Sequence, residues 1–270
     1  MTAAVQERTT GVPSAARQLG ALVRMELLLL RRNMTATVLS VVTPMVIGVV
    51  LVSGDYDTEG AVARTSGVIG MMAIFSVHHH LVTAYASRRQ EMVLKRLRVG
   101  LPADSTILVG AASATVLVFV VQAVALVGYG MVVSDLPMPV NPLTMLVAML
   151  LGAAVLGAFA AALSAVTRSS EAAMLTTLPT VAIFLMAPGV LVPLGTMPPA
   201  VEDAAMFLPM GPFTEVLRTS WLGHELGGGA ELGFLGTTVA ALPWLAVLVA
   251  WLALAGWITK RYFRWEPRHS

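Results

Sequence analysis

The sequence predicts an all-α, polytopic membrane protein. Hydrophobic residues make up 57% of the 270 residues and charged residues only 12%, whereas a soluble globular chain carries about 25% charged residues. A soluble domain of this size could not bury so much apolar surface. There is no cysteine, so a disulfide framework, a thiolate metal site and a cysteine nucleophile are excluded. The composition therefore argues against a soluble enzyme, a disordered chain and a secreted disulfide-rich domain.

Six windows without Asp, Glu, Lys or Arg mark the expected membrane spans. Each window holds at least 22 residues, and a helix needs about 20 apolar residues to cross the hydrocarbon layer. A charge at the bilayer centre costs about 2.5–3.5 kcal/mol on insertion scales, so charge-free stretches are favoured there. The windows predict six transmembrane helices, with expected ranges of 35–54, 66–87, 106–133, 143–167, 172–194 and 233–258.

The segments around these spans complete the predicted domain organisation. Residues 1–14 form a polar N-terminal tail, residues 15–259 the six-helix transmembrane domain, and residues 260–270 a basic tail. Prolines after Asp135 mark a loop before the fourth span, and Gly195 begins the stretch that ends the fifth. Proline is tolerated inside a span because neighbouring helices can satisfy the freed carbonyl groups. Kinks are expected at the prolines within spans, which are Pro44, Pro179, Pro188 and Pro243.

The distribution of Lys and Arg predicts the orientation. With both termini in the cytoplasm, 15 of the 17 basic residues lie on the inner side, and only Arg64 and Arg218 lie outside. Cytoplasmic loops carry an excess of Lys and Arg, so the inverted topology is rejected. The expected location is the plasma membrane. The first span is not a cleaved signal, because its charged leader is more than 30 residues long.

An amphipathic helix is expected over Ala15–Arg32, before the first span. Arg17, Arg24 and Arg31 recur every seven residues and so share one helical face, while leucines occupy much of the rest. Such a helix lies in the membrane interface. It either anchors the chain to anionic lipid or also offers a docking surface to a cytoplasmic partner.

The first inside loop, Arg88–Asp104, is both basic and apolar. Glu91 precedes Lys95 by four residues, a favourable helical pair. The loop is too rich in leucine and methionine for a solvated connection, which predicts a short helix from Arg88 to Val99, ended by Gly100. Two roles remain open: a positive-inside retention signal, or a helix that transmits force from a partner.

The outside segment Gly195–Glu231 is long for a connection. Phe213, Val216, Leu217 and Trp221 are spaced for one helical face, with Glu215, Arg218 and Thr219 on the other. A re-entrant or interfacial helix explains this pattern better than a free loop. It either closes an outer gate or caps the bundle.

Three consecutive histidines, His78, His79 and His80, lie within the second span. Successive helix residues point about 100° apart, so the three cannot face one metal ion, and a zinc site is not expected. Polar groups at this depth mark functional sites or form interhelical hydrogen bonds. Both readings stay open, and one or two of the rings are expected to face the bundle interior.

The chain carries no energy-converting motif of its own. No G-x-x-x-x-G-K-[ST] sequence is present, so the chain has no phosphate-binding loop. No Asp or Glu lies within a predicted span, although ion-coupled transporters usually need one there. No catalytic residue and no metal ligand set is identified. A six-helix protein of this kind is expected to depend on a partner for energy.

The order of these segments resembles the permease subunit of type-2 ABC exporters, the family that includes daunorubicin-resistance permeases. The resemblance runs from about Leu19 to Tyr262. It rests on the amphipathic helix before the first span, the basic segment Arg89–Arg98 after the second, and the outer stretch Pro209–Phe213, which leads into Glu215–Arg218 and then Trp221–Gly223. The histidines are not part of the family pattern.

The resemblance implies a homodimer or close heterodimer of permeases with two cytoplasmic ABC ATPase subunits, in a lipid membrane and without nucleic acid. The chain would not itself be an enzyme or hold a cofactor, since ATP and Mg²⁺ would bind to the ATPase. It implies that the surface helix and first inside loop contact the ATPase and that the outer helices close the exit. The expected ATPase-coupling residues are Arg24, Arg31, Glu91, Lys95, Arg96 and Arg98, and the outer gate residues are Phe213, Leu217 and Trp221.

Two functions follow as alternatives. The first is export of a lipophilic drug, antibiotic or lipid-like substrate, driven by ATP, with His78, His79 and His80 beside the substrate pathway. The second is a proton-driven secondary transporter that uses the same intramembrane histidines.

Overall fold

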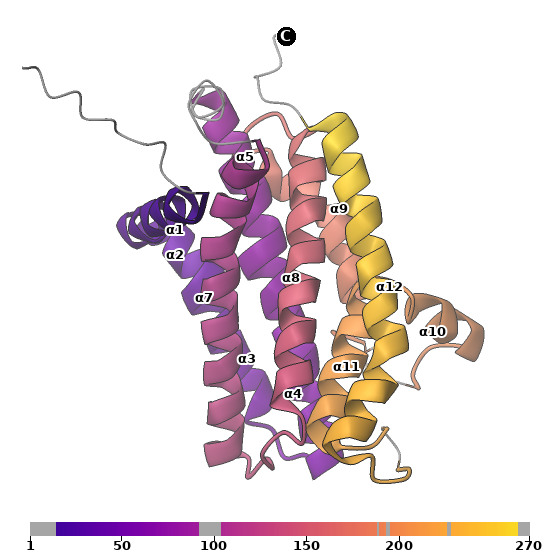
Figure 1. Cartoon of the computed structure of the whole chain (residues 1–270). Helices are drawn as coiled ribbons and strands as arrows, with labels where there is room; N and C mark the ends of the chain where they lie inside the picture. The colour runs from indigo at the N-terminus through magenta and orange to yellow at the C-terminus, as the bar shows by residue number, and fades with distance from the viewer. Residues whose placement is uncertain (1–14, 92–103, 188, 193–194, 226–227, 264–270) are drawn as a thin grey trace, which may run out of the picture.

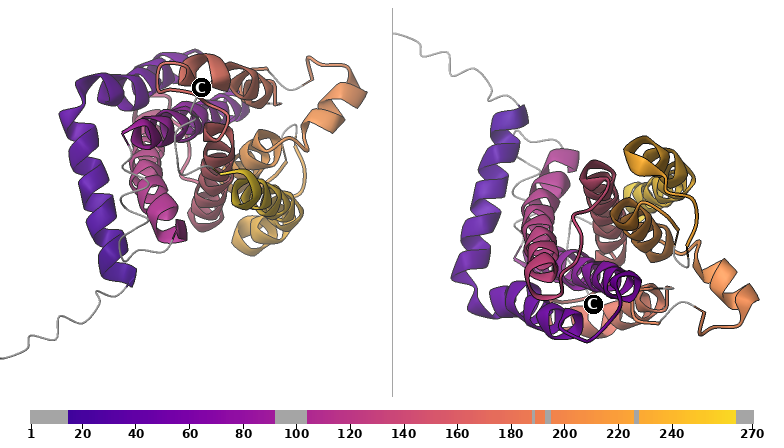
Figure 2. Two further views of the ribbon diagram at one scale, coloured as in Figure 1. Left: turned by 90° about the horizontal axis from the view of Figure 1, so that it is seen from above. Right: turned by 90° about the horizontal axis from the view of Figure 1, so that it is seen from below.

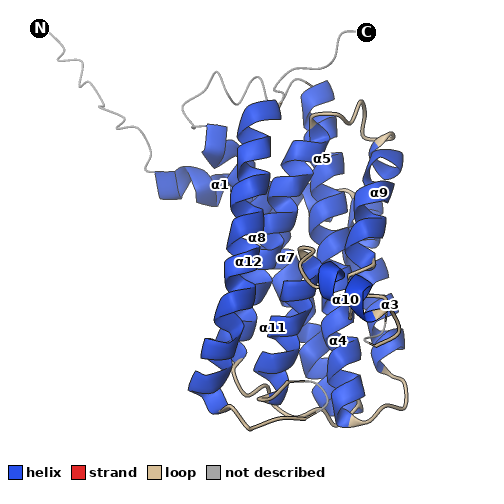
Figure 3. Cartoon of the chain, turned by 90° about the vertical axis from the view of Figure 1, so that its right-hand side faces the viewer, coloured by secondary structure: helices blue, strands red, loops and turns tan. Residues whose placement is uncertain are grey.

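The computed structural model shows a bundle of long helices and, over the residues it describes, no β-strand (Figures 1 and 3). The structure describes residues 15–91, 104–187, 189–192, 195–225 and 228–263. The tails 1–14 and 264–270 and the predicted loop helix beyond residue 91 therefore lie outside the described residues. The bundle has one end where α1, α5 and the C-terminal part of α12 gather, here called the α1 end (Figure 1).

Four helices of the described part are long and apolar enough to cross a membrane. They comprise the continuous helix Thr58–Gln90, the Leu108–Val133 part of α7 (Asp104–Val133), α8 (Pro142–Ser164) and α12 (Gly233–Tyr262). These agree with the second, third, fourth and sixth predicted spans. The second begins eight residues earlier than expected, because Asp57 caps its start: the Asp57 carboxylate accepts a hydrogen bond from Gly60 N at 2.9 Å.

The helix Thr58–Gln90 lies at the centre of the bundle. It consists of α4 (Thr58–Ala73), the π-helical segment η2 (Ile74–His79) and α5 (His80–Gln90). It contacts α3, α7, α8, α9 and α11 along its length. Most of its apolar side chains are buried, among them Ile69, Met72 and Leu81. By contrast, α7 and α12 expose large apolar side chains such as Val121, Val132 and Leu235, as expected for faces in contact with lipid.

The first and fifth predicted spans correspond to shorter apolar helices, Ser40–Val52 and Ala173–Leu185. The first belongs to an unbroken helical run of α2 (Met34–Thr37), π-helical η1 (Val38–Val42) and α3 (Thr43–Val52). The fifth was expected to continue to residue 194, and this was wrong. The helix α9 (Ala173–Leu185) ends early because the chain turns at Gly189, whose φ of 79° is left-handed and whose N–H bonds Val192 O at 2.9 Å.

The helix α1 (Ala15–Arg32) lies across one side of the bundle instead of running along it (Figure 2). It packs against α7. Leu22 sits on Gly110 of α7 so closely that a Cβ at Gly110 would lie 2.8 Å from the Leu22 Cβ. Arg24 and Arg31 are exposed, whereas Leu27 and Leu30 are half-buried. This arrangement is that of an interfacial amphipathic helix.

Two helices, α10 (Pro199–Ala205) and α11 (Met210–Leu222), connect α9 to α12. No residue of α10 is buried, and it projects from the side of the bundle (Figure 1). The helix α11 is different: it lies inside the bundle against α4, α8 and α12. The expected polar face of this helix was wrong, since Arg218 and Thr219 are buried together with Phe213 and Trp221.

The end of the bundle opposite α1 is closed by a network of polar contacts. Asn141 caps α8 by accepting a hydrogen bond from Thr144 N, and its amide donates to Phe234 O, Thr237 Oγ1 and Thr238 Oγ1 of α12 at 2.8–3.0 Å. Trp221 Nε1 donates to Pro137 O at 2.8 Å. The loop before α8 therefore holds the end of α11 and the start of α12 in place.

Candidate functional site

The first candidate site is a layer of polar side chains between the central helix and α9. His78 Nε2 lies 2.9 Å from Thr180 Oγ1, and His79 Nδ1 lies 2.9 Å from Thr177 Oγ1. The two threonines also donate to carbonyl groups of their own helix, Thr177 to Ala173 O and Thr180 to Thr177 O. Two histidines and two threonines thus join the central helix to α9 deep within the apolar bundle.

His78 is fully occupied by protein partners. Its second ring nitrogen, Nδ1, lies 3.2 Å from Leu156 O of α8, and its ring meets Phe184 edge to face with centroids 5.3 Å apart. The side chain is completely buried. Because both nitrogens and one edge of the ring are engaged, His78 holds three helices together. His79 is half-buried and uses one ring nitrogen in this layer.

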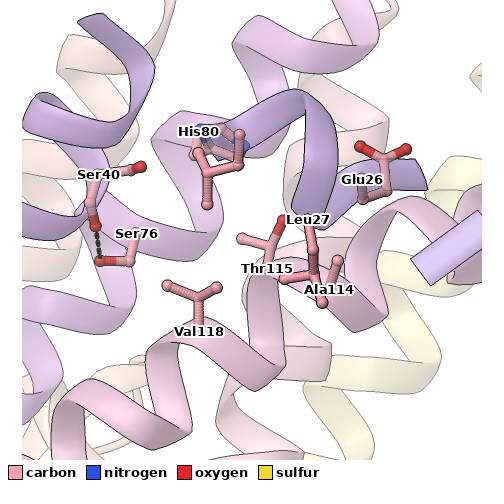
Figure 4. Close-up of a pocket in the computed structure, with 9 residues that line it drawn as sticks. Glu26, Leu27, Ser40, Ser76, His80, Ala114, Thr115 and Val118 are labelled. Carbon is pink, nitrogen blue, oxygen red and sulfur yellow. Dashed lines mark hydrogen bonds between the residues drawn. The ribbon is translucent and has the colours of Figure 1, made fainter. Parts of the chain in front are cut away.

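His80 faces a different region, a small cavity between α1, α7 and the two π-helical segments (Figure 4). The cavity has a volume of about 20 Å³, enough for one water molecule. Its walls carry polar groups as well as aliphatic ones. The lining residues are Glu26, Leu27, Leu30, Ser40, Ser76, His80, Ala114, Thr115 and Val118.

The three histidines do not form a metal centre. They point to α8, α9 and the α1 side respectively. Among the described residues, no group of three His, Cys, Asp or Glu side chains is placed to hold a metal ion. The chemistry available in the histidine layer is therefore hydrogen bonding.

The second candidate site is the junction at the α1 end, where the central helix stops. Arg88 donates to the Glu26 carboxylate of α1, and both side chains are largely buried. The neighbouring Arg89 is buried and donates to Ser164 O, at the last residue of α8, and to Thr167 O just beyond it. Gln90 Oε1 accepts from Ser170 N at 3.2 Å. Three successive side chains thus fix α1 and the α8–α9 connection to the end of the central helix.

The family model for ABC-2 type transporters matches residues 17–222. The chain belongs to the ABC-2 type transporter family. It is a membrane-embedded, multi-pass permease of the type-2 ABC class, and permeases of this family work with ATPase partners. No curated protein matches the chain significantly. The match includes α1, the histidine layer, the junction at the α1 end and α11.

Three of the six predicted coupling residues of the permease lie within the described part of the chain. Arg24 and Arg31 lie on the exposed face of α1, near the junction. Glu91 is exposed just beyond α5 and accepts from Ser87 Oγ at 2.9 Å, a contact within its own helix end. Lys95, Arg96 and Arg98 lie outside the described residues, so their part in coupling stays a prediction.

The predicted gate residues of the permease lie in its core. Phe213, Leu217 and Trp221 are all completely buried. Phe213 packs closely against α8 at Gly152, where any Cβ would collide with the phenyl ring. In this conformation the three side chains fix α11 to the bundle, and their role as a gate stays a prediction.

Sequence reasoning missed the partners that make these sites. In sequence, Arg89 resembles the other cations of the first inside loop, although its position at the end of a span gives it access to carbonyl groups at the end of a neighbouring helix. Glu26 is absent from the predicted site residues. It is nevertheless the only carboxylate within the α1 sequence, and it lies on the side of the helix away from Arg24. Thr177 and Thr180 are spaced for one face of α9, a signal that could have suggested a polar contact.

A charge exchange tests the junction between α1 and α5. Glu26→Gln is expected to lower stability by about 1–3 kcal/mol, because it leaves the largely buried Arg88 guanidinium without its carboxylate. The double variant Glu26→Arg with Arg88→Glu is expected to recover most of the loss. Thermal unfolding in detergent measures both. An unchanged midpoint for Glu26→Gln would show that the pair does not hold α1.

Proposed function

We propose that this permease is the membrane-spanning subunit of an ATP-driven exporter for a lipophilic drug, antibiotic or lipid-like substrate. The family match over residues 17–222 carries the proposal. The absence of a phosphate-binding loop from the sequence and of Asp and Glu from the six charge-free windows supports a separate energy source. The apolar spans favour a lipophilic substrate over a sugar. The family match does not favour the proton-driven alternative.

We infer an assembly of two permeases, identical or closely related, with two ABC ATPase subunits. ATP and Mg²⁺ would bind to the ATPase. The exposed basic face of α1, with Arg24 and Arg31, supports a docking role, and the segment that holds Lys95, Arg96 and Arg98 follows directly after the junction. Affinity purification of the tagged permease with bound ATPase subunits tests this arrangement. Purification of the permease without an ATPase under conditions that preserve membrane complexes would contradict it.

We further propose six membrane crossings. The run Met34–Val52 holds 19 helical residues, or about 28 Å at the usual rise, which is close to the hydrocarbon thickness. The fifth crossing combines two pieces. The helix α9 occupies the half of the bundle nearer the α1 end, and α11 occupies the other half (Figure 1). In this proposal, α9 and α11 together make one crossing.

The proposed topology places the α1 end on the cytoplasmic side of the plasma membrane. Arg88 and Arg89 lie in the last turn of α5, and Lys260 and Arg261 lie in the last turn of α12. Both helix ends belong to the α1 end (Figure 1), as the positive-inside rule requires.

Because the chain has no cysteine, single introduced cysteines can be labelled without background. Cysteines at Thr58, Asp135 and Gly228 are expected to react with an impermeant maleimide from outside, and cysteines at Arg98 and His269 only after permeabilisation. Labelling of Arg98→Cys in intact cells would overturn the orientation.

The histidine layer is proposed to tune substrate preference. His79→Ala is expected to change the ratio of transport rates between substrates several-fold, because His79 is half-buried and its ring is only partly engaged. His78→Ala removes contacts to α8 and α9 and is expected to lower membrane abundance instead. Transport of several substrates by each variant, normalised to abundance, measures the difference. Identical substrate profiles at normal abundance for all three single histidine variants would leave only a structural role.

A further inference from the structure

Two π-helical segments lie beside each other in the bundle. η1 (Val38–Val42) interrupts the helix that leads into α3, and η2 (Ile74–His79) interrupts the central helix. The two segments contact each other, and both contact α7. A π-helical turn widens the helix and leaves carbonyl groups without their usual partners, and such turns are frequent at functional sites.

The sequence explains the first of these segments. Pro44 is the second residue of α3 and carries no N–H. The carbonyl group four residues earlier, that of Ser40, therefore loses its helical donor, and the proline ring crowds it. The helix widens over Val38–Val42 in response. The Ser40 carbonyl accepts hydrogen bonds from two other helices.

Side chains from two other helices bind carbonyl groups of this segment. Ser76 Oγ of η2 donates to Ser40 O at 2.6 Å (Figure 4). Gln122 Nε2 of α7 donates to Val41 O at 2.9 Å and to Ser40 O at 3.4 Å. Both donor side chains are buried, and so is Ser40. The Gln122 Oε1 atom is buried and accepts from no described residue, so this amide stabilises the contact with its donors alone.

Packing differs on the two sides of this contact. On the α1 side lies the cavity of about 20 Å³ that Ser40, Ser76 and His80 help to line. On the other side, α3 and α4 pack closely: a Cβ at Gly48 would lie 3.1 Å from Val68 Cγ1 and 3.4 Å from Leu126 Cδ1. Close-packed side chains resist displacement, whereas a cavity leaves room for it.

We propose that η1 and η2 form a paired hinge, closed by Gln122 and Ser76 acting on the Ser40 and Val41 carbonyl groups. At this hinge the α1-side halves of the two helices tilt against their outer halves. Gln122 is a positioning residue of the hinge. The inference rests on the proposed function in one respect: the motion would carry the pull of the ATPase from α1 and α5 into the bundle.

Hydrogen–deuterium exchange of the full chain in nanodiscs tests the hinge without any transport assay. Gln122→Leu and, independently, Ser76→Ala are expected to speed amide exchange over 38–42 and 74–79 by roughly tenfold, since each removes a buried hydrogen bond. Exchange over Thr43–Val52 should stay as in the wild type. The control Ser113→Ala, which removes a bond only to Val109 O within α7, should change neither segment. Unchanged exchange at both π-helical segments in both variants, or equal acceleration along α3, would overturn the hinge.

Cross-linking tests whether transport requires the tilt at the hinge between η1 and η2. In the cysteine-free chain, the pair Ser40→Cys and Ser76→Cys is linked with a short bis-methanethiosulfonate reagent, with Gly48→Cys and Val68→Cys as the matched pair on the packed side of the same two helices. Linking the first pair is expected to stop ATP-dependent transport reversibly, and linking the second to leave most of it. Full transport with the first pair linked, or equal loss with the second, would contradict the hinge. A wild type without ATP-dependent transport, but with the exchange pattern above, would overturn the proposed function and not the hinge.

Discussion

Trp221→Ala is expected to lower the free energy of unfolding of the permease by about 3–5 kcal/mol, the range for a large aromatic side chain in a packed core. The Trp221 side chain is completely buried in α11, and its Nε1 donates to Pro137 O at 2.8 Å. The substitution therefore creates a cavity and removes the bond that holds the loop before α8. Thermal or denaturant unfolding in detergent, with membrane abundance, measures the effect.

The matched control is Trp257→Ala in α12. Trp257 is 61% exposed on the outside of the bundle, so its loss removes little packing within the chain and is expected to cost less than about 0.5 kcal/mol. Equal stability losses for the two tryptophans would contradict the placement of α11 within the bundle. Constitutive leakage of substrate through a Trp221→Ala variant that still reaches the membrane at normal abundance would support the proposed outer gate.

Charge reversal of Lys95 and Arg96 is expected to reduce ATP-dependent transport at least tenfold while insertion stays normal. The reason is electrostatic: if this segment is the docking surface proposed above, reversing two of its charges places like charges opposite each other, which costs several kcal/mol. The segment follows directly after the junction where Arg88 contacts Glu26 and Arg89 contacts the end of α8. A disturbance of docking here would therefore disconnect the ATPase from the central helix. The double variant Lys95→Glu with Arg96→Glu is assayed for ATP hydrolysis and transport together.

Lys260→Glu with Arg261→Glu provides the control for net charge. These two residues lie in the last turn of α12 at the α1 end of the bundle, so the same change of charge is made outside the proposed coupling segment. The control is expected to keep most transport. Normal transport by correctly inserted Lys95→Glu/Arg96→Glu protein would show that this segment does not couple the ATPase to the bundle.

The membrane-spanning part of the fold could be predicted largely from where charges are missing. Charge-free windows find α7, α8 and α12, because hydrocarbon excludes charge irrespective of tertiary contacts. They do not reveal where a helix ends within an apolar stretch. The fifth window therefore suggested a full span, whereas α9 stops at Leu185 and the chain turns at Gly189. The left-handed glycine that decides this end lies in an apolar sequence without a charge to mark it.

The polar contacts inside the bundle were harder to predict than the spans. The histidines stand out in sequence, but their partners Thr177 and Thr180 lie about a hundred residues away, and only the packing of α9 on the central helix brings them together. Arg218 was expected on a polar face, yet it is 1% exposed, because its charge pairs with Glu215 within the same helix. A local ion pair allows burial that a count of charges does not anticipate.

Transport by purified permease in vesicles, with and without the ATPase that co-purifies with it, tests the central claim most directly. A fluorescent lipophilic substrate is followed in three conditions: permease and ATPase with MgATP, the same vesicles without ATP, and permease alone under a pH gradient. Substrate movement is expected only in the first condition. Movement by the permease alone under the pH gradient would contradict it.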